Sequence, residues 1–164
     1  MRKYVFIYVF LVLLSLYLFR EKILPGAEGL TPELERLMAD KADQYGVDRA
    51  LVKAIAKKES NFNPRAKNPA DPSYGLMQIT PILAQDYGLV KDYRNPTASE
   101  IERLYDLENN LYVGCSQLAH LRSIRSFDVA VQMYNVGQTG YMNGYRNYDY
   151  LNKVRFYYEK YSSL

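Results

Sequence analysis

The chain has 164 residues, of which 48% are hydrophobic and 24% are charged, so it has the composition of a globular protein with room for one domain and its core. The formal net charge is +3. The first 22 residues hold four basic residues and one acidic residue, which leaves 17 basic and 17 acidic residues in the rest of the chain. That balance gives no indication of a nucleic-acid-binding surface.

The amino-terminal segment is hydrophobic, because residues 4–19 contain no charge and basic residues flank them on both sides. A membrane span needs about 20 residues, and the core of a signal peptide has about 7–15. We expect an uncleaved signal anchor at residues 1–22 and a linker at residues 23–30, with a cleaved signal peptide as the alternative. The charge bias favours a domain on the extracytoplasmic side of the membrane.

The rest of the sequence predicts helices, with no strand alternation and no repeat. Thr31-Pro32 is a typical helix start and Gly46 a typical helix end. Asp48 can cap the next helix. We therefore expect an all-α domain over residues 31–164. The predicted helices run from Thr31-Pro32 to Gly46, over 47–59, from Thr80-Pro81 to Gly88, and over 100–105, 107–122, 127–135 and 150–161.

A long segment between two of these helices, residues 60–79, is rich in Asn, Pro and Gly. Loops of this length in a compact domain are usually functional or disordered. The apolar stretch at residues 75–79 favours order. We expect this loop to fold back over the end of the helix that precedes it.

Glu59 ends the helix before this loop and continues its apolar stripe, since Leu51, Ile55 and Glu59 follow one another at i, i+4 steps. Burial raises the pKa of a carboxyl group, and the negative end of the helix dipole acts in the same direction. A raised pKa is typical of a general acid that works near neutral pH. The alternative is a half-exposed residue at a helix end with no catalytic role.

Three single residues on the predicted helix 107–122 have structural interpretations. Cys115 is the only cysteine, so the chain can form neither an internal disulfide nor a thiolate metal site, and we expect a buried apolar residue. His120 is the only histidine and is expected on the surface. Gly114 is expected to permit a close approach by a neighbouring segment. We expect no metal and no cofactor.

Several sequence blocks resemble the soluble type (SLT) of lytic transglycosylase, a lysozyme-like family. They are Glu-Ser-Asn-Phe-Asn-Pro-Arg-Ala at 59–66, Ser-Tyr-Gly-Leu-Met-Gln-Ile-Thr-Pro at 73–81, Asn110-Leu111 with Gly114, and Tyr-Asn-Val-Gly at 134–137. The resemblance covers about residues 45–161. The chain departs from it at Asn68, where the family often has Ser, and in a loop that is about one residue longer, with prolines at 69 and 72.

The resemblance implies a fold like that of goose-type lysozyme, with a cleft for peptidoglycan glycan strands. It implies that Glu59 is the single catalytic acid. A strip of four residues, Gly75 to Gln78, would form one wall, and Tyr134 with Asn135 would approach from the opposite side, the Tyr134 hydroxyl lying near the carboxyl group. The full set of expected substrate-binding residues is Ser60, Asn68, Ser73, Gly75, Leu76, Met77, Gln78, Tyr134 and Asn135.

The resemblance implies cleavage of the β-1,4 bond between N-acetylmuramic acid and N-acetylglucosamine, with formation of a 1,6-anhydro ring. Glu59 would donate a proton and later recover one. Two alternatives are a muramidase that uses water and a membrane-tethered glycan-binding or assembly protein without activity. Asp71, the acidic residue of the loop, is interpreted as a solvated turn residue. Expected partners are glycan strands, the membrane and possible cell-envelope or secretion machinery, but not nucleic acid.

Overall fold

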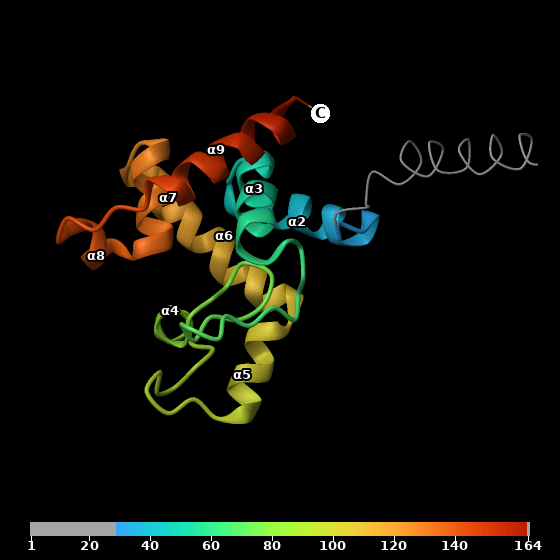
Figure 1. Ribbon diagram of the computed structural model, residues 1–164. Helices are drawn as coiled ribbons and strands as arrows, with labels where there is room; N and C mark the ends of the chain where they lie inside the picture. Colours follow the sequence, from blue (N-terminus) through green and yellow to red (C-terminus); the bar gives the residue numbers. More distant parts are fainter. Residues whose placement is uncertain (1–28, 164) are drawn as a thin grey trace, which may run out of the picture.

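The structure, a computed structural model, describes residues 29–163 (Figure 1). Within that range it is helical, and two isolated β-bridges join Tyr74 to Lys67 and to Ile79. The prediction of an all-α domain is confirmed for these residues. The helices are α2 (Pro32–Tyr45), α3 (Arg49–Ser60), α4 (Pro81–Asp86), α5 (Ala98–Tyr105), α6 (Leu107–Ile124), α7 (Phe127–Val136), α8 (Gln138–Met142) and α9 (Tyr148–Ser162).

Local side-chain chemistry sets the ends of α2 and α3. The Thr31 hydroxyl accepts a hydrogen bond from the Leu34 amide at 3.2 Å, and Gly46 ends α2 with a left-handed φ of 65°. The Asp48 carboxylate accepts from the Ala50 amide at 2.8 Å. Because Asp48 stands outside the helix as its cap, α3 begins two residues later than predicted.

Other boundaries differ from the predictions by a few residues. A capping box between Thr97 and Glu100 starts α5 at Ala98, two residues early. Asn147 caps α9 and starts it at Tyr148, also two residues early. Ser126 precedes α7 as expected, but its side chain makes no capping hydrogen bond. The short helix α8 is absent from the predictions, because five residues with two of low helix propensity carry no periodic signal.

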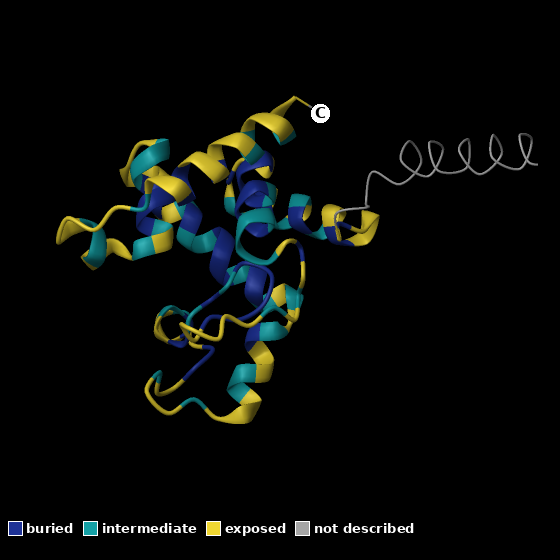
Figure 2. Ribbon diagram, in the orientation of Figure 1, coloured by how far each residue is buried: buried dark blue, intermediate teal, exposed yellow. Residues whose placement is uncertain are grey.

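Helix α3 lies at the centre of the upper part of the molecule and packs most extensively on α9, with α2 on another side (Figure 1). Its apolar stripe, including Leu51, Val52 and Ile55, is buried. Helix α6 runs from this bundle to the lower part, where α4, α5 and the long loop lie (Figures 1 and 2). The loop is therefore supported by a long helix along its buried side.

Gly114 on α6 has the packing role that its position predicts. A Cβ atom on this residue would lie 2.3 Å from the Met77 sulfur and 3.1 Å from the Met77 Cβ. Any larger residue would force the Met77 side chain to shift, so glycine permits the close approach of the loop segment around Met77. This contact sets the distance between the loop and α6.

No helix among residues 29–163 is long and apolar enough to cross a membrane. The predicted signal anchor, residues 1–22, and most of the predicted linker, residues 23–30, lie outside the described residues.

Candidate active site

Glu59 lies in the last turn of α3, immediately before the chain reverses direction. Asn61 and Phe62 both adopt left-handed backbone conformations, with φ of 53° and 63°. Such conformations are uncommon outside glycine and cluster at functional sites. Burial of the Phe62 side chain holds the second of them in place. The turn directs the loop away from α3 and leaves the Glu59 side chain at the junction.

The Glu59 carboxyl group faces α9, where the Tyr150 hydroxyl donates a hydrogen bond to its Oε1 atom at 2.5 Å. Burial raises the pKa of Glu59 above its ordinary value, while the Tyr150 hydrogen bond and the positive charge of Lys58 act in the opposite direction. The residue as a whole is only half-buried. Glu59 thus combines a desolvated acid with partial access, as a general acid requires.

Tyr150 is the residue in contact with Glu59 that the sequence did not reveal. It is buried, and burial together with the charge of Glu59 raises its pKa well above the ordinary value of a tyrosine. It therefore remains a hydrogen-bond donor. In the sequence it occupies only one position on the apolar side of a predicted helix, 91 residues from Glu59. Nothing local indicates which side chain it faces.

Asn110, on α6, makes three hydrogen bonds, two to the long loop and one to the last turn of α5. Its Nδ2 donates to the carbonyl oxygens of Tyr74 at 2.8 Å and Leu104 at 2.7 Å. Its Oδ1 accepts from the Met77 amide at 2.7 Å. Because Asn110 is buried, each of these bonds replaces one to water that these backbone groups cannot make.

Gln78 and Ser73 form a second network inside the loop. The Gln78 Nε2 donates to the carbonyls of Ala66 at 3.2 Å and Gly75 at 2.9 Å. The Gln78 Oε1 accepts from the Ser73 hydroxyl at 2.9 Å. The polar atoms that the resemblance assigns to sugar binding are therefore already engaged with the loop itself.

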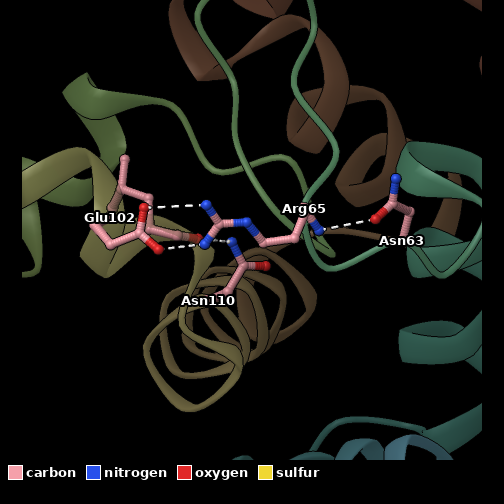
Figure 3. A network of polar contacts seen from close by, with 5 residues as sticks. Asn63, Arg65, Glu102 and Asn110 are labelled. Atoms are coloured by element: carbon pink, nitrogen blue, oxygen red, sulfur yellow. Dashed lines mark hydrogen bonds and ion pairs between the residues drawn. The ribbon is translucent and has the colours of Figure 1, made fainter. Parts of the chain in front are cut away.

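A third set of contacts ties the start of the loop to α5 (Figure 3). The Arg65 guanidinium pairs with the Glu102 carboxylate and lies over the Tyr105 ring, 4.3 Å from its centroid. The Asn63 Oδ1 accepts from the Arg65 amide at 2.9 Å. The ion pair is exposed, so its role is to position the loop more than to stabilise the fold.

Tyr134 and Asn135, at the end of α7, lie on the other side of the loop. The Tyr134 hydroxyl donates to the Met77 carbonyl at 3.0 Å. Burial, and secondly the charge of Glu59, raise the pKa of Tyr134 well above its ordinary value. The tyrosine hydroxyl bonded to Glu59 is nevertheless that of Tyr150. Asn135 is exposed, and its Oδ1 accepts from the Asn147 Nδ2 at 2.9 Å.

A cavity of about 500 Å³ opens beside Tyr134 and Asn135. Its walls come from the loop, α4, α6, α7 and α8, and two carboxylates, those of Asp71 and Asp86, are in its lining. The remaining lining residues are polar or apolar and uncharged: Thr80, Ile82, Leu83, Gln117, Met133, Val136, Gly137, Gln138, Thr139 and Gly140. Its size and mixed lining suit a polar polymer segment.

The other predicted site residues have varied surroundings. The Ser60 hydroxyl donates to the Ala56 carbonyl at 3.1 Å, within its own helix. Asn68 is exposed, and its Oδ1 accepts from the Ala70 amide at 3.0 Å. Leu76 and Met77 are fully buried. In this conformation those two residues support the site from within and line no open surface.

The single cysteine and histidine lie where the sequence predicts. Cys115 is buried on α6, and burial raises the pKa of its thiol to about 12. His120 is exposed on the same helix. Among residues 29–163, no three His, Cys, Asp or Glu side chains gather as a possible metal site.

The helical domain thus holds a desolvated acid, Glu59, against Tyr150, and a cavity that opens beside Tyr134 and Asn135 and does not have Glu59 in its lining. Residues 36–154 match the family described as the Transglycosylase SLT domain. The match covers most of the chain and includes Glu59, Tyr134 and Tyr150. The chain belongs to this family.

Curated relatives and one solved structure agree with the family. The chain is 36% identical to "Membrane-bound lytic murein transglycosylase E" of Buchnera aphidicola, over 57% of this chain and 43% of that protein. It is 40% identical to "Membrane-bound lytic murein transglycosylase C" of Sodalis glossinidius, over 50% of this chain and 22% of that protein. The chain thus spans less than half the length of these relatives.

The solved structure is that of an inactive Glu-to-Gln mutant of the lytic transglycosylase Slt from Pseudomonas aeruginosa. It superposes with a TM-score of 0.52 at 21% identity, over 73% of this chain and 20% of that one. At this identity the likeness concerns the fold.

Proposed function

We propose that this chain is a lytic transglycosylase that cleaves peptidoglycan glycan strands, with Glu59 as its acid and base. The observation that carries the proposal is the environment of the Glu59 carboxyl group: it is desolvated, it is hydrogen-bonded by Tyr150, and it sits in a chain of the SLT family. The names of the relatives, which all describe lytic murein transglycosylases, support the substrate class.

The reaction has two proton transfers at one carboxyl group. Protonated Glu59 donates to the bridging oxygen of the β-1,4 bond, and the bond between that oxygen and C1 of N-acetylmuramic acid breaks. The C6 hydroxyl oxygen of the same sugar then bonds to C1, and its proton returns to the Glu59 carboxylate. The sugar ends in a 1,6-anhydro ring and the enzyme recovers its starting protonation state.

A single acid can perform both steps only if its pKa lies near the working pH. Burial provides the upward shift of the Glu59 pKa, and Tyr150 and Lys58 limit it. The ionised form that follows the first transfer is stabilised by the Tyr150 hydroxyl. Proton transfer of this kind contributes about 10²–10⁴-fold to the rate.

One observation favours hydrolysis as a second candidate. Asp71 lines the cavity beside Tyr134 and Asn135, so a second carboxylate is available there, and ordinary glycosidases use two. A water molecule activated by Asp71 would produce a reducing-end muramic acid in place of the anhydro sugar. An Asp71→Asn variant separates the candidates, because only the hydrolytic route loses its base.

The decisive experiment compares the full chain with its Glu59→Gln variant on purified sacculi, with soluble products analysed by mass spectrometry. We expect anhydro-muropeptides from the wild type and a loss of at least about 10²-fold in release by the variant. Reducing muramic acid as the main product would establish hydrolysis. Equal release by the two proteins would exclude Glu59 as the acid, and release by neither would leave a binding role.

The setting of the activity follows from the amino-terminal run and from the relatives named membrane-bound. We propose that residues 1–22 attach the enzyme to the membrane and that the domain faces the cell wall on the extracytoplasmic side. Envelope or secretion machinery that needs a local opening in the wall is a compatible partner. Protease access to the domain in intact spheroplasts tests the proposed side.

A further inference from the structure

The segment from the last residue of α8 to the first residue of α9, residues 142–148, exposes several large side chains. Met142 is 71% exposed, Tyr145 68% and Tyr148 65%. In Figure 2 the chain beyond α8 is coloured mainly as exposed. Single exposed apolar residues are ordinary, but three within seven residues concentrate exposed apolar and aromatic surface in one short segment, and such concentration is typical of a binding surface. We call this segment the outer tip.

The outer tip is held in one conformation by its own contacts. The Arg146 guanidinium lies 3.4 Å from the centroid of the Tyr141 ring and donates to the carbonyls of Tyr141 at 2.6 Å and Tyr145 at 2.7 Å. The Tyr145 amide donates to the Gly140 carbonyl at 3.0 Å. A rigid aromatic surface loses little conformational freedom when it binds a ligand.

The outer tip is also anchored to the site. The Asn147 amide donates to the Gln132 Oε1 at 2.8 Å, and its side chain bonds to Asn135, which lines the cavity. Three residues after Asn147, Tyr150 bonds to Glu59. The same short stretch therefore connects the exposed rings, the cavity wall and the acid.

The outer tip continues the wall of the cavity. Gly140 is part of the cavity lining, and a Cβ atom on it would lie 3.9 Å from the Tyr145 ring. Ile82, 55% exposed on α4, belongs to the lining as well. The Tyr145 ring therefore adjoins the cavity lining at Gly140.

We propose that the outer tip is a stacking surface for a sugar ring of the glycan strand, outside the cavity and remote from the bond that is cleaved. This inference rests on the proposed function. Tyrosine rings offer an apolar face to the C–H face of a pyranose and a hydroxyl to its polar rim. Asn143 beside them is exposed and supplies an amide that can bond to sugar hydroxyls.

A sugar is favoured over a protein as the occupant. A stable protein–protein interface buries about 800 Å² on each partner, much more than three side chains provide. The exposed rings are also tyrosines next to glycine and asparagine, a composition suited to polar ligands. The surface should therefore improve the binding of strands that are long enough to reach from the cavity to the tip.

The test measures binding by titration calorimetry with the full chain in detergent, carrying Glu59→Gln so that strands stay intact. The ligands are peptide-free glycan strands, a tetrasaccharide and a much longer preparation. We expect the double variant Tyr145→Ala with Tyr148→Ala to raise the Kd for long strands about tenfold. The ratio of short-strand to long-strand Kd should fall accordingly.

Two further variants control for folding. The pair Tyr145→Phe and Tyr148→Phe keeps the rings and should keep most of the long-strand affinity. Phe156→Ala removes a ring that is 63% exposed on α9, outside the outer tip, and should leave the affinities unchanged. Similar losses for short and long strands, or none in the alanine pair, would overturn the inference. If the parent protein binds no strand of either length, the proposed function fails instead.

Discussion

At the scale of single residues, burial and two neighbouring side chains have opposing effects on the pKa of the Glu59 carboxyl group. Burial against α9 raises its pKa, and the Tyr150 hydroxyl and the Lys58 charge lower it. Lys58 lies over the Tyr150 ring, 5.0 Å from its centroid, so the cation and the donor belong to one arrangement. The acid is tuned by a tyrosine that contributes no charge of its own.

Tyr150→Phe isolates this hydrogen bond. Because the bond favours the ionised form, its loss raises the pKa of Glu59, and the alkaline limb of the pH profile for kcat/KM should move up. A hydrogen bond to an ionised group contributes about 1.5 kcal/mol, so the upward move should be large enough to resolve in the profile. Tyr158 lies on α9, as Tyr150 does, and its hydroxyl is bonded to Asp48. Tyr158→Phe should therefore leave the alkaline limb of the profile in place. A downward move in Tyr150→Phe would contradict the assignment.

At the scale of elements, the long loop is an ordered part of the site because α6 holds it. Asn110 bonds to its Tyr74 carbonyl and Met77 amide, and Gly114 allows the approach of Met77. The non-glycine residues with positive φ in the described chain are Asn61, Phe62 and Gln78, which lie at the two ends of this loop. The local strain is thus concentrated where the loop leaves α3 and where it approaches α4.

Two glycines with similar backbone conformations test how the loop is held. Gly75 has φ of 80° and Gly88 has φ of 72°. A Cβ atom on Gly75 would lie 2.4 Å from Asn110 Nδ2 and 2.7 Å from the Leu104 carbonyl, whereas one on Gly88 would meet nothing within 4 Å. We expect Gly88→Ala to lower the free energy of unfolding by about 1 kcal/mol from backbone strain alone.

Gly75→Ala should lower the free energy of unfolding by about 3 kcal/mol, because steric overlap with fixed atoms adds to the same strain. Urea unfolding curves of the two variants provide the comparison. Hydrogen exchange should show loss of protection in the loop for Gly75→Ala only. Equal destabilisation would mean that Asn110 does not hold the loop in the way described.

At the scale of the whole molecule, the burial of an acid lowers the free energy of unfolding at pH values where the acid would ionise in water. Below the ordinary Glu pKa of 4.5 the residue is protonated in both the folded and the unfolded chain. As the pH rises past that value, the unfolded chain releases the proton first, because the pKa of Glu59 is raised in the folded state. Stability therefore falls with rising pH until the folded-state pKa is passed.

Glu59→Gln removes this titration and keeps an oxygen that can accept from Tyr150. The free energy of unfolding of the variant, relative to that of the wild type, should increase as the pH rises above the ordinary Glu pKa of 4.5. Denaturant unfolding at several pH values measures it. Groups that titrate in both proteins cancel in the difference. A gap that is constant with pH would mean that Glu59 has no raised pKa in the folded protein.

The sequence alone determined the features that depend on near neighbours in the chain. Hydrogen bonds over three residues or fewer end the helices, so Thr31, Gly46 and Asp48 could be recognised from their identities. The i, i+4 periodicity of α3 likewise placed Glu59 on a buried face, because the helical repeat is a property of a short stretch of chain. Gly114 stood out because a glycine within a helix face needs a packing reason.

Only the tertiary structure decided which distant residues meet. It brought Tyr150 to Glu59 across 91 residues, bonded the Tyr134 hydroxyl to Met77, and placed the outer tip beside the cavity. The physical reason is that such contacts depend on how α9 packs against α3 and α7, which involves many weak apolar contacts and has no signature in a short stretch of sequence. Helix periodicity shows that a face is buried, but it does not show what lies against that face.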